Sequence, residues 1–245
     1  MSYFGWGFTS SAVDAGAEGA ATSGPKIPSY ATPEDVDYRA FGEESIKILM
    51  DRDSGEDKVT TWALESEDEN AIIWRGAVEG SDWAAFRVKM TFNATKDAIE
   101  AALLDVDVLL KLDDMTERLI VVYEADKEHK MSLRHMTSKA IFPIAGREFV
   151  VVTYTTELPD GRRVIASRSI DVESIQAFEG YVRAENIITG YIIEEKQDTS
   201  GATYSEVTLL AHADLAGYIP ASIVNMLGTS ATVQALTNLK NILEN

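Results

Sequence analysis

The end of the chain constrains the fold most, because apolar side chains recur there with the period of a helix over about twenty-five residues. Pro220 stands in the first turn, where the missing N–H costs no helical hydrogen bond. The apolar positions are Ile219, Ile223, Val224, Met226, Leu227, Val233, Leu236, Leu239, Ile242 and Leu243. So broad a stripe predicts a helix that lies across a sheet, not one packed along a narrow seam.

Most of the preceding chain has the near-alternating apolar and polar pattern of β-strands. Nine runs have it, at 58–66, 71–80, 83–92, 118–125, 129–138, 148–158, 162–172, 180–196 and 204–215. Helical spacing appears at 33–52, 96–105 and 106–114. Thr95 is a candidate N-cap for the second of these helices. This order predicts an α+β fold with a curved antiparallel sheet of about nine strands, closed over its interior by the final helix.

The first residues of the sequence differ in composition from the rest. Residues 1–33 are rich in Gly, Ala, Ser and Pro without periodicity, which predicts a flexible leader. The rest, residues 34–245, is expected to form one domain, and 45% apolar residues suffice for its core.

Charge and composition narrow the function classes. The 22 Lys and Arg residues against 40 Asp and Glu residues leave a net charge of −18, which repels nucleic acid and anionic membranes. The chain has no cysteine, and neither a secretory signal nor a membrane-spanning apolar run is recognisable. We therefore expect a monomeric cytoplasmic protein that binds no nucleic acid.

Motifs for catalysis are missing. His129, His135 and His212 are scattered, without the spacing of a metal site. Nucleophile elbows, dinucleotide-binding turns and phosphate loops are absent from the sequence. These observations predict a protein without metal or cofactor that is not an enzyme.

Three stretches carry a family resemblance. Gly146–Val150 is similar to Pro-Arg-Asp-Phe-Val, Gly180–Glu185 to Gly-Val-Ile-Arg-Ala-Glu, and Asp214–Asn225 to Asp-Leu-Lys-Gly-Trp-Leu-Pro-Lys-Ser-Ile-Ile-Asn. In this order and spacing they resemble the StAR-related lipid-transfer (START) domain, or helix-grip fold. The resemblance implies reversible binding of a single lipid, such as a sterol or phospholipid, in an internal apolar cavity, and possible transfer between membranes.

The resemblance also implies which residues meet the lipid. Some family members have an acidic residue on the fifth strand and an arginine on the sixth, and here Arg134 and Thr153 stand at these positions. The residues predicted to bind lipid are Arg134, Met136, Phe149, Val151, Thr153 and Arg168. For Arg168 the alternation leaves both the cavity and solvent open. A buried Arg134 requires an acidic head group, an internal partner such as Glu148, or a flipped register.

The entrance is expected between the final helix and the apolar tip of the loop 139–146. The predicted gate residues are Phe142, Ile144, Ile223, Met226 and Leu227. Such a tip also predicts transient membrane contact through apolar insertion. Two alternatives stay open. One is a helix-grip enzyme of the cyclase type that uses Arg134, His135 or Thr153 on a hydrophobic substrate, and the other is an interaction module without ligand.

Overall fold

The computed structural model describes residues 36–127, 129–172, 175–217, 219 and 221–244, with backbone alone for 221–227. Four helices and ten strands lie in this part of the chain. They are α1 (Tyr38–Ser54), β1 (Thr60–Glu67), β2 (Ala71–Val78), β3 (Ala85–Phe92), α2 (Lys96–Leu104), α3 (Val106–Leu112), β4 (Thr116–Asp126), β5 (Met131–Ser138), β6 (Gly146–Glu157), β7 (Arg163–Ser169), β8 (Tyr181–Arg183), β9 (Glu185–Gln197), β10 (Thr203–Asp214) and α4 (Ala221–Glu244). The predicted leader lies outside the described residues.

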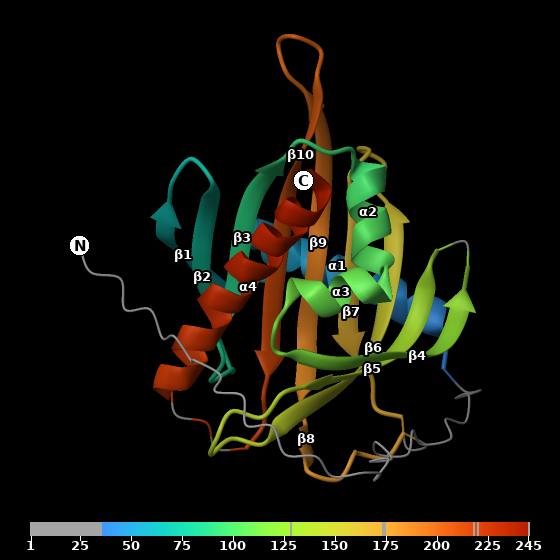
Figure 1. Cartoon of the computed structure of the whole chain (residues 1–245), viewed down its shortest axis with the longest axis vertical. Helices are drawn as coiled ribbons and strands as arrows, with labels where there is room; N and C mark the ends of the chain where they lie inside the picture. Colours follow the sequence, from blue (N-terminus) through green and yellow to red (C-terminus); the bar gives the residue numbers. More distant parts are fainter. Residues whose placement is uncertain (1–35, 128, 173–174, 218, 220, 245) are drawn as a thin grey trace, which may run out of the picture.

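All ten strands form one curved sheet, in the order β1-β2-β3-β10-β9-β7-β6-β5-β4, with β8 added beside β6 (Figure 1). The predicted α+β fold is confirmed. One predicted strand, 180–196, is in fact two strands that part at Ala184. They part because β8 runs parallel to β6, whereas β9 pairs antiparallel with β7 and β10.

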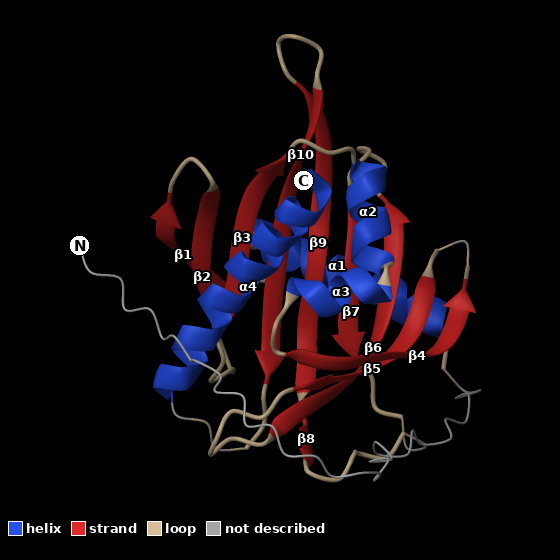
Figure 2. Cartoon of the chain, viewed as in Figure 1, coloured by secondary structure: helices blue, strands red, loops and turns tan. Residues whose placement is uncertain are grey.

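The helices cover both faces of the sheet. In Figure 2, α2, α3 and α4 lie in front of the strands and α1 lies behind them. Leu49 of α1 is fully buried, and the helix approaches β9 so closely that a Cβ at Gly190 would stand 2.4 Å from a Leu49 methyl carbon. On the other face Leu236 and Leu239 of α4 are fully buried. The final helix therefore lies across the sheet, as its apolar stripe predicts.

The two short helices are separated by a cap. Thr95 is the N-cap of α2, as predicted, and its hydroxyl accepts a hydrogen bond from the Ala98 N–H at 3.3 Å. Asp105 ends α2 and starts α3, because its carboxylate accepts from the N–H groups of Asp107 and Val108. This break turns α3 toward β4, while α2 packs over β7 and β9 (Figure 1).

The described helices also bear on membrane topology. None of them is both long enough and apolar enough to cross a bilayer.

Candidate functional site

A cavity of about 230 Å³ lies between the sheet and the helices α2 and α3. Its lining is mostly apolar and includes Leu103 of α2, Leu109 of α3 and Ile165 of β7. Five of the residues predicted to bind lipid line it, namely Arg134 and Met136 of β5 and Phe149, Val151 and Thr153 of β6. The antiparallel register explains their grouping, since it sets Arg134 opposite Val151 and Met136 opposite Phe149 on one face of the sheet.

Arg134 is the charged group of this cavity. Only 7% of the residue is exposed, and its Nε donates to the Ser132 hydroxyl at 2.9 Å. Among the described residues, no carboxylate lies within ion-pair distance of its guanidinium, and the two terminal nitrogens have no hydrogen-bond partner. Burial lowers the pKa of Arg134 to about 10, so the side chain is still a cation at neutral pH. The cavity thus holds a positive charge with unused donors.

Glu148, the internal partner considered for Arg134, lies on the other face of β6. It accepts hydrogen bonds from His135 Nε2 at 3.0 Å, the Phe178 N–H at 2.9 Å and Arg183 Nε at 2.9 Å. His135 is therefore turned away from the cavity, and burial lowers its pKa. His135 does not line the cavity in which it was expected to act on a substrate, and its ring stacks on Phe178 instead.

Sequence reasoning missed the lining residues Ser167, Asn186, Thr189 and Tyr191, and the first three are already hydrogen-bonded. The Thr153 and Ser167 hydroxyls lie 2.8 Å apart. The Asn186 amide donates to the Ser167 carbonyl at 3.1 Å and accepts from the Thr189 hydroxyl at 2.8 Å. Burial raises the pKa of Tyr191 to about 12, which keeps its hydroxyl protonated. Arg134 is thus the lining group with the most unused hydrogen-bonding capacity.

The missed β9 residues were hidden by an irregularity in pairing. Between His212 and Ala213 the β9–β10 register shifts by one residue, so Asn186 and Thr189 line the same cavity despite their odd spacing. Strict alternation would put them on opposite faces. Ser167 requires no such shift, because it lies two residues after Ile165, which also lines the cavity, and alternate residues of β7 share a face.

Arg168 is the predicted lipid-binding residue that the structure places elsewhere. Its Nε donates to the Ser45 hydroxyl of α1 at 3.1 Å, and its guanidinium lies 4.0 Å from the Phe41 ring centre and pairs with Glu44. Its neighbour Ser167 faces the cavity instead. Assigning Arg168 to lipid is therefore corrected, because strand alternation turns it toward α1.

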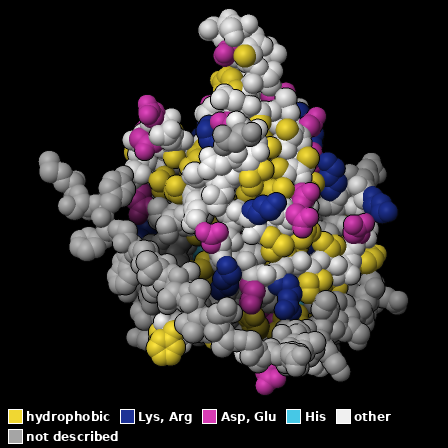
Figure 3. All heavy atoms as spheres, in the orientation of Figure 1, with side chains coloured by type: hydrophobic (Ala, Val, Ile, Leu, Met, Phe, Trp, Pro, Cys, Tyr) yellow, Lys and Arg dark blue, Asp and Glu magenta, His cyan; other side chains and the backbone are white. Residues whose placement is uncertain are grey.

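A second cavity of about 220 Å³ adjoins the first at Phe149, which lines both. Its wall includes Ile141 and Ile144 of the β5–β6 loop and Ala231 of α4. Phe142, at the tip of that loop, is 98% exposed. Figure 3 shows the face that carries α2, α3 and α4, where apolar side chains lie between scattered charges. The side chains of Ile223, Met226 and Leu227 lie outside the described residues.

The described residues contain no cluster of three or more histidine and carboxylate side chains placed to hold a metal ion.

Comparison with known proteins gives a consistent set of similarities. The family model described as "START domain" matches residues 60–245. An uncharacterized protein of Pseudomonas aeruginosa, PA1579, is 24% identical over 184 residues, which cover 75% of this chain and 87% of that protein. Among solved structures, human StAR-related lipid transfer protein 5 superposes with a TM-score of 0.70 at 13% identity, over 84% of this chain and 98% of the other. A STAR-related lipid transfer protein of Xanthomonas axonopodis has a TM-score of 0.62 at 19% identity, over 75% of this chain and 99% of the other.

Proposed function

This chain belongs to the START domain family, and from that premise we propose that it binds one lipid molecule in its internal cavity and transfers it between membranes without covalent chemistry. The observation that carries the proposal is an apolar cavity whose wall holds one buried cation, Arg134, without a counter-ion among the described residues. A filled core would leave no room beside that cation, and a catalytic site would need an acid or base beside it. A lipid accounts for both observations, because its apolar part fills the cavity and its polar group meets the charge of Arg134.

The same cation favours a lipid with an acidic head group. A guanidinium has five N–H donors, and a carboxylate or phosphate satisfies them in pairs. Ligand-sized pockets span roughly 300–1,000 Å³. Since the two adjoining cavities measure about 230 and 220 Å³, we infer that one ligand occupies both. Its charged end lies at Arg134 and its apolar part passes Phe149.

Native mass spectrometry of the full chain purified from cells tests this function. We expect a bound mass that matches a lipid and disappears after extraction with organic solvent. A protein with an empty cavity, and no uptake from added vesicles, would favour the interaction module. Release of a chemically altered lipid would favour the enzyme.

Transfer is expected to stop when the loop 139–146 is tied to α4, because a covered apolar cavity admits a lipid only if its cover moves. Ile144 and Ala231 line the same small cavity, and the chain has no cysteine of its own. Cysteines at these two positions, joined by a short bismaleimide, should slow lipid exchange between vesicles by at least about tenfold.

The two single-cysteine variants, treated with the same reagent, control for labelling. An unchanged exchange rate in fully cross-linked protein would rule out this gate.

Phe142 is proposed to touch the membrane while the gate is open. Its exposed ring can enter the bilayer interface, whereas the net charge of −18 opposes attraction to anionic lipid. In vesicle flotation, Phe142→Ser should lower the bound fraction, and Leu64→Ser, at a 56% exposed position on β1, should not. Binding that added salt abolishes would contradict apolar insertion.

A further inference from the structure

A surface groove of about 490 Å³ lies on the outer side of Arg134, between α2–α3 and the strands β4 and β5. Ala101 and Leu104 of α2 form one wall, and Val121 of β4 forms the other. Arg134 lines this groove and the internal cavity as well. The guanidinium therefore stands where an outer, partly polar space meets an inner, apolar one.

We propose, building on the lipid-binding function above, that this groove is the head-group site and a second opening of the cavity. A carboxylate or phosphate of an anionic amphiphile lies in the groove against Arg134, and its apolar chain extends inward past Met136 and Phe149. The ligand is thereby oriented with its charge toward α2 and β4 and its tail toward the loop 139–146.

At the other end of the cavity, the described residues form no comparable anion site. Arg147 lines the cavity beneath the loop, but its guanidinium already donates to the carbonyls of Leu215 at 2.9 Å, Ala145 at 2.6 Å and Ala216 at 3.0 Å. Lys139, also in that lining, donates to the Asp114 carbonyl at 2.6 Å. Arg134 has only Ser132 as partner among the described residues, so it offers an incoming anion the most donors.

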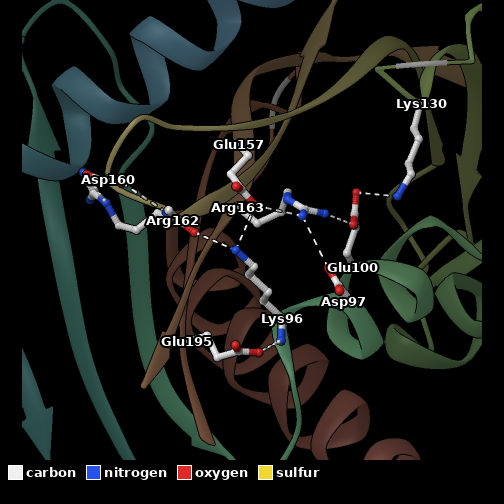
Figure 4. Close-up of polar contacts among 10 residues, drawn as sticks. Lys96, Asp97, Glu100, Lys130, Glu157, Asp160, Arg162, Arg163 and Glu195 are labelled. Atoms are coloured by element: carbon white, nitrogen blue, oxygen red, sulfur yellow. Dashed lines mark hydrogen bonds and ion pairs between the residues drawn. The ribbon is translucent and has the colours of Figure 1, made fainter. Parts of the chain in front are cut away.

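The other charged residues that line the groove are Glu124, Asp126, Lys127 and Lys130, and of these Asp126 pairs with His129 and Lys130 with Glu100. Lys130 donates to Glu100 at 2.8 Å, and Glu100 also pairs with Arg163, as Figure 4 shows. These ion pairs join α2 to the turn between β4 and β5 and to β7, and hold the α2 wall in place. Within the part of the chain that the structure describes, no ion pair joins Glu124 or Lys127 to another residue, Arg134 included. The arrangement leaves Arg134 open to an external anion.

A carboxylate placed beside Arg134 should compete with the ligand. Val121 stands directly opposite Arg134 in the β4–β5 register and is 38% exposed, so a longer polar side chain fits there. Val121→Glu supplies an internal anion, and Val121→Gln has the same shape without the charge. With the full chain, Val121→Glu should bind oleate and oleyl phosphate at least about tenfold more weakly than Val121→Gln does.

Affinity for the uncharged monoolein should be equal in the two variants. The tighter of the two anionic probes identifies carboxylate or phosphate as the preferred group. If Val121→Glu binds oleate and oleyl phosphate as tightly as Val121→Gln does, the head-group site is overturned.

Thiol protection tests the location independently. In Val121→Cys the single cysteine should react with a maleimide at least about tenfold more slowly when oleate is bound, whereas in Leu64→Cys the rate should not change. Native mass spectra of the same samples record occupancy. If oleate is bound but the thiol of Val121→Cys reacts with maleimide at an unchanged rate, the ligand does not lie in the groove, and only the groove assignment is overturned. No uptake of any of the three probes overturns the proposed function, and this inference with it.

Discussion

Replacing Arg134 with methionine is expected to weaken binding of an anionic amphiphile by at least about tenfold, because the ligand loses its charge-assisted hydrogen bonds. Methionine keeps the length and apolar packing of the side chain. Binding of uncharged monoolein should therefore be unchanged or tighter. Isothermal titration of both probes against wild-type and variant protein measures the difference.

The same variant should be more stable than the wild type by roughly 1–3 kcal/mol without ligand, because a buried cation lacking a counter-ion costs free energy of folding. The lowered pKa of Arg134 has this origin. Urea unfolding at neutral pH measures it. Two results would count against ligand recognition by Arg134, namely unchanged oleate affinity or a variant that fails to fold, which would show a structural role.

Replacing Glu148 with glutamine is expected to cost about 3–5 kcal/mol of unfolding free energy, the second large effect. The fully buried carboxylate accepts three hydrogen bonds, from His135, Phe178 and Arg183, and an amide nitrogen at either oxygen position would face a donor. For a chain of this size the melting temperature should fall by about 6–20 °C.

Glu44→Gln is the matched control, since it breaks the ion pair of an exposed carboxylate with Arg168. Exposed pairs contribute about 0–1 kcal/mol. Thermal unfolding of both variants should separate them clearly. A loss below about 1 kcal/mol for Glu148→Gln would mean that the network does not hold residues 175–180 to the sheet.

The fold followed from the sequence because its signals are local and repetitive. Alternation located the strands within a few residues, and the apolar stripe of 219–243 predicted a helix across the sheet. The division of 180–196 into β8 and β9 was missed, because it depends on which strands pair with each half.

The candidate site could be predicted on the strands where the family resemblance indicated which of the two alternating faces meets the cavity. On β5 and β6 the resemblance assigned five residues to the cavity face, and the structure places all five along the cavity, namely Arg134, Met136, Phe149, Val151 and Thr153. On β7 the resemblance did not indicate which face meets the cavity. Alternation separated Ser167 from Arg168 but left open which of them faced inward.

What the sequence determined by itself is the order of elements, the helix that covers the sheet and the alternating faces of each strand, because these depend on neighbours within a few residues. The tertiary structure decided the rest. Glu148 pairs with Arg183 and His135 and not with Arg134, the register shift brings Asn186 beside Thr189, and Arg134 stands between cavity and groove. Each of these depends on segments far apart in the chain, whose distances are set only when the sheet curves and the helices close over it.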